Sequence, residues 1–426
     1  MLRSTIGILA VLLPAGAAAQ SASADSYTRY ELLAPETSSF RIVYDVTGTT
    51  GGARFYFNPI REGSEASDEA VIDRMTSQPL KFEVVTGEQA RQDGQRGASL
   101  TGHYIKVHLA RPVPEGGEAR LRILKTYKDP ASYYTKDGVI VFDRSLGIKR
   151  NSIVLPPGYE LVACNFPSQV IEEADGRLAV SHLNDTPSAA PLLIRARKLP
   201  ASRPSSGSGT PAANGGGRGA GEPAGAPPAS APQVGRSEIT GLRISERAIQ
   251  DREIVYFLKQ PETHAFSLYH DYTESREGMD RYLNVVRAGS TVSDPSALVL
   301  DTGQTLATET LRGDAITKAG LDVGDVTPET EVVVIRFDPV KKGQSIRLRI
   351  AETYADPSRY GLVEGRLVWH RSFGRPANDV VLPEGWYVTG SSIPAVVRLE
   401  DDGRVRLEFV NPRPDSIDTI ITARRR

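Results

Sequence analysis

Two stretches of this 426-residue chain carry the same polar and aromatic residues at the same spacing. The first reads Thr126-Tyr-x-Asp-Pro-x-x-Tyr133, and the second repeats it at Thr353–Tyr360. Aromatic rings that stack on a sugar or peptide, with fixed polar groups that orient it, are typical of concave binding sites. With matched Arg and Asn residues further along, the candidate ligand-binding residues are Tyr127, Asp129, Tyr133, Arg144, Asn151, Tyr354, Asp356, Tyr360, Trp369, Arg371, Asn378 and Trp386.

The same residues also have a structural interpretation, which we favour. Proline presets its φ angle, so Asp129-Pro130 is suited to begin a turn, and a tyrosine can pack its ring while its hydroxyl binds loop backbone. Both tryptophans of the chain, Trp369 and Trp386, lie in the second stretch. If one copy binds a ligand, the second is favoured, although larger core rings also explain the tryptophans.

Residue types that most often act as catalysts or metal ligands do not recur between the stretches. None of the six histidines has a histidine at the matching position, and no pair has the spacing of a helix-borne zinc motif. The one cysteine, Cys164, matches Ser391 and has no histidine near it in sequence, which indicates a small buried side chain. We therefore predict no catalytic residue, no metal site and no cofactor.

A polysaccharide hydrolase is an alternative that the acidic residues leave open. Such an enzyme needs two carboxyl groups about 5–10 Å apart in one cleft. The acids kept in both stretches are Asp129 with Asp356, Glu173 with Glu400, and Asp175 with Asp402. However, Asp175 and Asp402 each precede a glycine, as in a tight hairpin.

Composition and charge exclude several classes of partner. The 51 Lys and Arg residues nearly balance the 52 Asp and Glu residues, so the chain has no net positive charge to attract DNA or RNA. Beyond the N-terminus, no apolar run reaches the roughly 18 residues that a membrane helix requires. We predict neither nucleic-acid binding nor a membrane span. The arginines of two matched strands, Arg120 and Arg122 with Arg347 and Arg349, are interpreted as a solvated face.

Composition also divides the chain. Residues 1–19 have the charged, apolar and small-residue regions of a signal peptide, with a predicted cut after Ala19, which places the mature chain in the periplasm or outside the cell. Residues 199–238 are rich in Gly, Pro, Ser and Ala, which predicts a flexible linker that lets its neighbours move independently. The linker separates repeat 1 (26–198) from repeat 2 (239–426), whose last three arginines are expected to fray.

The two repeats are related along most of their length. A shift of 227 aligns Ile105–Arg197 with Val332–Arg424 without a gap, and 34 of the 93 pairs are identical. Tyr30–Asp68 aligns with Tyr256–Asp294 at a shift of 226, so the register changes between Gly87 and Ile105. We interpret that polar stretch as a long loop rather than a seam between subdomains. Two copies of this length indicate tandem duplication of a complete domain.

Alternation of apolar and polar residues predicts the fold class. Ile105–Leu109, Ile346–Ile350 and Val405–Phe409 have the period of two that marks strands with one wet face. Short turn signals separate such segments, and helix candidates are few, at 67–75 and 245–252. We predict an all-β chain of two tandem, internally duplicated antiparallel β-sandwich-type domains, joined by a disordered Gly/Pro/Ser/Ala linker.

These features together predict an exported, non-catalytic protein that binds a protein or glycan at the cell envelope or outside it. Two tethered copies would raise the effective concentration of weak sites. The alternatives are the hydrolase described above and a structural component of an envelope assembly, in which the sandwiches pair with each other or with a larger complex.

Overall fold

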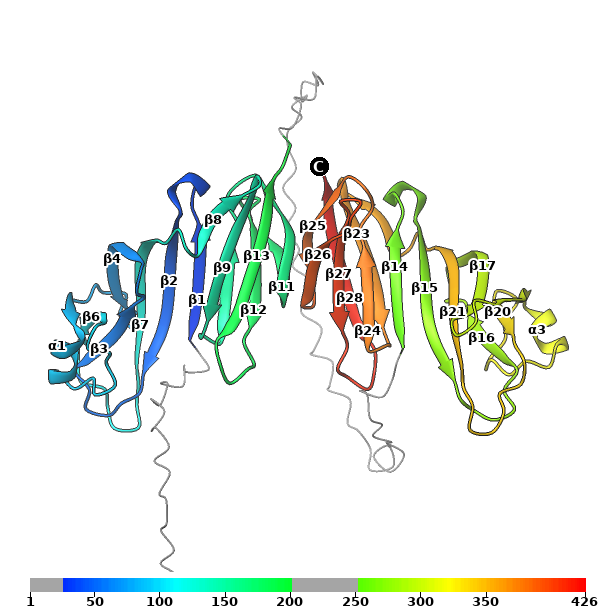
Figure 1. Ribbon diagram of the computed structural model, residues 1–426, viewed down its shortest axis with the longest axis horizontal. Helices are drawn as coiled ribbons and strands as arrows, with labels where there is room; N and C mark the ends of the chain where they lie inside the picture. Colours follow the sequence, from blue (N-terminus) through cyan, green and yellow to red (C-terminus); the bar gives the residue numbers. More distant parts are fainter. Residues whose placement is uncertain (1–25, 201–251) are drawn as a thin grey trace, which may run out of the picture.

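The computed structural model describes residues 26–200 and 252–426, and within these ranges most regular elements are β-strands. The predicted all-β fold of two sandwich-type domains is confirmed (Figure 1). The predicted signal peptide lies outside the described residues, as do all but two residues of the predicted linker and all but the last residue of the helix candidate at 245–252.

The two halves contain matching sets of elements. The first half comprises β1 (Tyr27–Leu32), η1 (Pro35–Thr37), β2 (Ser39–Gly48), β3 (Phe55–Ile60), β4 (Glu65–Asp73), β5 (Phe82–Thr86), α1 (Gly87–Gln92), β6 (His103–His108), β7 (Ala119–Lys128), β8 (Tyr133–Lys136), β9 (Val139–Leu146), β10 (Arg150–Val154), β11 (Tyr159–Glu172), β12 (Leu178–Leu183) and β13 (Ala190–Lys198). The second comprises β14 (Glu253–Leu258), η2 (Pro261–Thr263), β15 (Ala265–Glu274), β16 (Arg281–Val285), β17 (Thr291–Val299), β18 (Thr305–Leu306), β19 (Thr308–Arg312), α3 (Asp314–Lys318), β20 (Glu331–Arg336), β21 (Ile346–Ala355), β22 (Tyr360–Val363), β23 (Arg366–Phe373), β24 (Ala377–Val381), β25 (Trp386–Ser391), β26 (Ala395–Leu399), β27 (Val405–Val410) and β28 (Ile417–Arg425).

Two long sheets run through both halves. The order of the first is β4-β7-β2-β1-β10-β12-β11-β25-β28-β23-β22. The order of the second is β18-β17-β21-β15-β14-β24-β27-β26-β11-β13-β9-β8. All pairs are antiparallel except β1–β10 and β14–β24. Apart from β18, which has no counterpart in the first order, the two orders match strand for strand as written, because β11 corresponds to both β25 and β26. Both halves therefore have the same topology.

Alternating sequence explains which side chains face the core. In β7, Leu121, Ile123, Lys125 and Tyr127 are buried, while the residues between them are more exposed. Their period of two places all four on the inner face of the sheet. One apolar cluster of buried residues then joins both halves, because it includes Tyr30 and Phe142 of the first as well as Tyr256 and Trp369 of the second.

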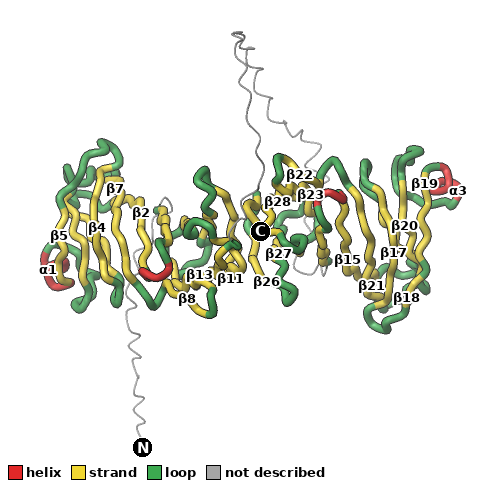
Figure 2. The backbone as a smooth tube through the Cα atoms, turned by 90° about the horizontal axis from the view of Figure 1, so that it is seen from above, coloured by secondary structure: helices red, strands yellow, loops and turns green. Residues whose placement is uncertain are grey.

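A small sheet lies at each end of the molecule, and we call each of these sheets with its helix an outer lobe. The lobes contain β3-β6-β5 with α1 and β16-β20-β19 with α3 (Figure 2). The polar stretch in which the repeat register changes joins neighbouring strands β5 and β6 of the first outer lobe, and it begins with α1. The helix candidate at 67–75 is wrong, because residues 65–73 form β4 and pair with β7.

The halves meet through equivalent strands at the centre. In β11, Cys164 pairs with Val397, Ser168 with Ala395 and Ile171 with Gly390. Ser168 and Ala395 are themselves matching positions of the repeat, 227 residues apart. A strand that pairs with its own equivalent in antiparallel register defines a local two-fold axis, as in an isologous dimer.

Ion pairs reinforce this central contact. The side chain of Glu160 is fully buried and accepts hydrogen bonds from Arg197 of its own half and from Arg426, the last residue of the chain. Glu172 binds Arg424 and another arginine of the second half. The expectation that the halves move independently is therefore not met. Arg424 and Arg426 are part of the contact, and Arg425 pairs with Glu262 of its own half, so the last three arginines are not frayed.

Candidate functional site

Asp129, the acidic residue that both repeats keep at this position, lies in a buried cluster with Arg144 and Ser132. Asp129 Oδ2 accepts a hydrogen bond from Arg144 Nη1 at 2.7 Å, and Asp129 Oδ1 accepts one from the backbone N–H of Ser132 at 3.0 Å. Burial opposes ionisation, but the hydrogen bonds from Ser132 and the charge of Arg144 hold the pKa of Asp129 below its usual value. The Asp-Pro unit thus begins a turn, as the structural interpretation predicted.

The conserved tyrosines and asparagine of the first half bind backbone around this cluster. Tyr133 donates its hydroxyl proton to the carbonyl of Leu33 at 2.8 Å, and Asn151 Nδ2 donates to the carbonyl of Ile148 at 2.7 Å. Tyr127 is 1% exposed and packs on Phe40. The matched residues of the second half repeat these contacts: Tyr360 donates to the carbonyl of Lys259, and Asn378 to that of Arg375.

The acidic cluster of the second half is built differently. Asp356 accepts hydrogen bonds from Ser358 Oγ at 2.8 Å and Ser290 Oγ at 3.1 Å, and it pairs with Arg359 Nη1 at 3.1 Å. Arg371, which matches Arg144, makes no ion pair among the described residues. Its guanidinium lies over three aromatic rings, which belong to Tyr256, Phe266 and Tyr354.

Both tryptophans lie in the core. Trp369 is fully buried and its ring contacts Tyr256, with the centroids 5.1 Å apart. Trp386 is 1% exposed, and its indole N–H donates to Gln260 Oε1 at 2.9 Å. Neither ring therefore offers a face to a sugar. The burial of the conserved rings supports the structural interpretation, and ligand binding by the twelve candidates stays a prediction.

Sequence analysis missed a buried polar group beside Tyr127 and another beside its counterpart, Tyr354. In the first half, Lys125 Nζ donates to Asn58 Oδ1 at 2.6 Å and to the hydroxyl of Tyr127 at 3.0 Å. Lys125 is 5% exposed. Burial, assisted by the positive charge of Arg144, lowers the pKa of Lys125 to about 7. The sequence did contain a sign of this burial, because Lys125 occupies one of the alternate positions of β7 that face the core.

The matching group of the second half has the opposite charge. Glu352 stands where the first half has Lys125, and Asn284 Nδ2 donates to its two carboxylate oxygens at 2.9 and 2.7 Å. Asn284 Nδ2 also donates to the hydroxyl of Tyr354 at 3.0 Å. Burial raises the pKa of Glu352 above its usual value. The two groups, Asn58–Lys125–Tyr127 and Asn284–Glu352–Tyr354, are called the lysine triad and the glutamate triad below.

Other ionisable residues are held by structural contacts. Glu173 accepts two hydrogen bonds from Arg29, at 2.5 and 2.8 Å, and Glu400 accepts one from an arginine of β27 at 2.5 Å. Asp175 and Asp402 each bind the arginine two positions later, within hairpin turns. In the ranges 26–200 and 252–426, no group of three or more His, Cys, Asp or Glu side chains is placed to hold a metal ion.

The two buried histidines and the cysteine lie apart from the acidic clusters. Burial lowers the pKa of His182 to about 4, and burial with nearby arginine charges lowers that of His270. Cys164 is fully buried at the central contact, and burial raises the pKa of its thiol. The expected small buried side chain at Cys164 is confirmed.

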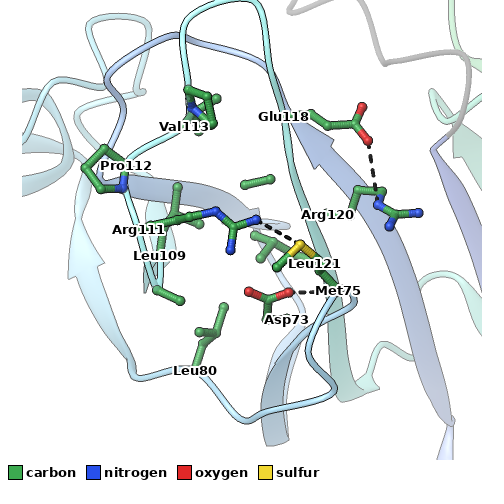
Figure 3. Close-up of a pocket in the computed structure, with 13 residues that line it drawn as sticks. Asp73, Met75, Leu80, Leu109, Arg111, Pro112, Val113, Glu118, Arg120 and Leu121 are labelled. Atoms are coloured by element: carbon green, nitrogen blue, oxygen red, sulfur yellow. Dashed lines mark hydrogen bonds and ion pairs between the residues drawn. The ribbon is translucent and has the colours of Figure 1, made fainter.

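Two hollows lie on the surface of the first half, in its outer part. A small one of about 110 Å³ lies under the loop between β6 and β7, where Arg111 Nη2 donates to Met75 Sδ (Figure 3), and contains none of the twelve candidate residues. A larger one of about 680 Å³, which we call the lobe cleft, lies between the β3–β4 connection and the β5–β6 lobe. Its lining includes Ser64, whose hydroxyl binds Asp129, so the cleft borders the acidic cluster.

Comparison with known proteins identifies no family for this chain. No family model and no curated protein matches the chain. Among solved structures, it is similar to an M1 zinc metallopeptidase from Deinococcus radiodurans (11% identity, TM-score 0.27, 40% of this chain and 41% of that one). An aminopeptidase N family protein from Idiomarina loihiensis has 9% identity and TM-score 0.25 over 40% of this chain and 29% of its own.

The collagen adhesin of S. aureus has 8% identity and TM-score 0.19, over 94% of this chain and 93% of its own. The chain spans about two fifths of the metallopeptidase and less of the aminopeptidase. None of these likenesses carries a functional argument. In the part of the chain that the structure describes, no helix has the length and apolar character needed to cross a bilayer.

Proposed function

We propose that this protein is an exported, non-catalytic binding protein. Its two halves contact each other at the centre, and its outer lobes bind a protein or glycan at the cell envelope or outside the cell. The supporting observation is where shared and divergent residues lie. Residues common to both halves fill the core and the turns, whereas the change of repeat register falls in an outer lobe. The lobes lie at opposite ends of the molecule (Figure 1).

The lobe cleft is the favoured contact surface in the first half. Its lining combines apolar side chains, Ile60, Ala66 and Val84, with ionisable ones such as Arg61 and Glu69. Such a mixture suits an extended peptide or a short glycan, which needs both apolar contact and a few polar groups for orientation. Two lobes fixed in one body would engage a repetitive partner more strongly than either lobe alone.

The equivalent topologies of the halves support an origin by duplication of one module, as the sequence repeat suggests. Pairing of equivalent strands at the centre further supports an ancestral module that formed a two-fold dimer. Fusion would then have kept the dimer contact within one chain. This contact gives partial support to the structural alternative, in which the sandwiches pair with each other.

The hydrolase alternative has less support. A general acid must keep its proton near neutral pH. The pKa of Asp129 is lowered against its burial by hydrogen bonds from Ser132 and the charge of Arg144, and that of Glu173 is lowered mainly by its hydrogen bonds with Arg29. These conserved carboxyl groups are therefore suited to ion pairs rather than to proton donation.

The proposal is tested by blocking the lobe cleft with charge. Val84 is 52% exposed and lines the cleft, so Val84→Arg fills it without removing core contacts. We expect the variant to bind at least about tenfold more weakly to ligands that a glycan array and immobilised envelope proteins identify for the wild-type chain. Binding is measured by surface plasmon resonance.

The matched control is Leu183→Arg. Leu183 ends β12 far from the cleft and is 62% exposed, so the same charge is added to a similar exposed aliphatic position. This variant is expected to bind as the wild type does. Equal binding by all three proteins would contradict a role for the lobe cleft.

A further inference from the structure

The arginine that binds the conserved acidic residue differs between the halves. In the first half, Arg144 Nη1 lies 2.7 Å from Asp129 Oδ2, and the arginine is 6% exposed. In the second, Arg359 takes the place of Ser132 and binds Asp356 Oδ2 at 3.1 Å. This exchange adds a guanidinium to the cluster and leaves the counterpart of Arg144 without its carboxylate.

That counterpart, Arg371, keeps its place in the fold but lacks an acceptor. Its Nη1 atom is buried without a hydrogen-bond partner. The guanidinium carbon lies 5.4 Å from the ring centroid of Phe266 and 5.7 Å from that of Tyr256. Aromatic faces attract a guanidinium, but they do not replace the oxygen acceptors that its N–H groups need. One guanidinium nitrogen of Arg371 therefore lacks an oxygen acceptor within the protein.

A third arginine, Arg287, lies close enough to this cluster for their charges to interact. Arg287 follows β16, is half-buried, and has no side-chain hydrogen bond or ion pair among the described residues. Burial lowers its pKa, and the positive charges of Arg359 and Arg371 lower it further. Three guanidinium groups therefore lie near one another, whereas the first half has Arg61, Ser132 and Arg144 at these positions.

Asp356, the acidic group that Arg359 binds, is fully engaged. Both oxygens of Asp356 accept hydrogen bonds, from Ser358, Ser290 and Arg359. Asp418 acts on Arg287 through its charge, and one of its two carboxylate oxygens, Oδ1, accepts a hydrogen bond from the hydroxyl of Ser372. The protein thus supplies fewer acceptors than the three guanidinium groups can use.

We propose that Arg287, Arg359 and Arg371 form a binding site for one oxyanion group, a carboxylate, sulfate or phosphate, in the second half only. The planar guanidinium donates two parallel N–H bonds, a geometry that fits the oxygens of such groups. The identity of the partner that carries the oxyanion rests on the proposed binding function. The inference adds that this partner has an acidic group where it contacts the second half.

The test measures binding of small oxyanions to the full chain. Inorganic phosphate, sulfate and glucuronate are titrated separately by calorimetry at constant ionic strength, with glucose as the uncharged control. We expect at least one oxyanion and not glucose to bind the wild-type chain. Preference for phosphate or sulfate points to an inorganic or ester group, and preference for glucuronate points to an acidic sugar; either supports the site. Arg287→Gln and Arg359→Ser are expected to weaken binding by about tenfold or more.

The matched control is Arg195→Gln, which removes an exposed guanidinium of β13 in the first half, outside the lobe cleft, and is expected to leave oxyanion binding unchanged. The proposal is overturned if no oxyanion binds the wild-type chain, or if Arg195→Gln weakens binding as much as Arg287→Gln does. It is also overturned if both second-half variants bind as the wild type. Val84→Arg should keep oxyanion binding, so failure of the lobe cleft and failure of this site are distinguishable.

Discussion

The lysine and glutamate triads occupy the same place in two halves of one topology, yet they carry opposite charges. Asn58 offers its carbonyl oxygen to Lys125, whereas Asn284 offers its amide group to Glu352. A tyrosine hydroxyl, which can donate or accept, completes each triad. The two residue types kept in both triads, Asn and Tyr, are thus those that can hydrogen-bond to either a cation or an anion.

The acidic clusters differ in a comparable way. The first half closes its cluster with the buried pair Asp129–Arg144, and the second moves the pairing to Arg359 and leaves Arg371 over its rings. In both places the backbone and the aromatic packing are kept while the charges change. Shape is therefore the property that the two halves share, and charge distribution is the property in which they differ.

The shared core gives the strongest test of this comparison. Trp369→Ala and its first-half equivalent, Phe142→Ala, each remove a fully buried ring and should each lower the free energy of unfolding by about 3–5 kcal/mol. Because one apolar cluster joins the halves, we expect both variants to shift one single transition in scanning calorimetry. Two transitions, only one of which moves in each variant, would show that the halves unfold separately.

The triads should respond to pH in opposite directions. Lys125 has a pKa of about 7 in the folded chain against 10.5 when unfolded, so between these values the unfolded chain binds the extra proton. Stability should therefore rise with pH in this window, by about 1.4 kcal/mol per unit at most. Lys125→Met should remove this slope and stabilise the chain by about 1–4 kcal/mol at pH 7, as measured by urea unfolding.

The glutamate triad supplies the control for the pH measurement. The pKa of Glu352 is raised in the folded chain, so above pH 4.5 the unfolded chain loses a proton that the folded chain keeps. Stability should fall as pH rises from 4.5 to the raised value, and Glu352→Gln should remove that fall. An unchanged slope between pH 7 and 10 in Lys125→Met would mean that the lysine is not desolvated.

Features set by local sequence were predicted well. The hairpin glycines Gly176 and Gly403 have φ angles of +80° and +83°, the conformation that the Asp-Gly pairs indicated. Strand alternation likewise predicted the all-β fold. In these cases, a few neighbouring residues determine the backbone, so the sequence contains the necessary information.

Long-range features were not predicted. Nothing local in β11 tells that Ser168 faces Ala395, since any edge strand with the same alternation could pair there. The alternation of β7 places Lys125 on the same face as the buried residues. Predicting its burial also required the knowledge that the outer lobe covers that face. The role of Arg371 depended on which arginine reaches Asp356, and that choice is made by three-dimensional packing rather than spacing.

The smallest expected effect concerns the charges that make the halves complementary at the centre. Glu172 binds Arg366 at 2.7 Å and Arg424 at 2.8 Å, and its repeat counterpart is Leu399. A contact between two first halves would place Val139 where Arg366 now faces Glu172, and a contact between two second halves would place Leu399 where Glu172 stands. The Glu172–Arg366 pair therefore favours the unlike pairing that the chain contains.

Glu172→Leu, which copies the residue of the second half, should lower the free energy of unfolding in urea by about 1 kcal/mol or less, because both arginines are partly exposed. The mirror variant, Leu399→Glu, places a carboxylate opposite the first half, in which Val139 stands at the position that matches Arg366. It should therefore change the free energy of unfolding less than Glu172→Leu does. If the two variants destabilise the chain equally, the ion pairs contribute no preference for unlike halves, and the central contact depends on strand pairing and apolar burial alone.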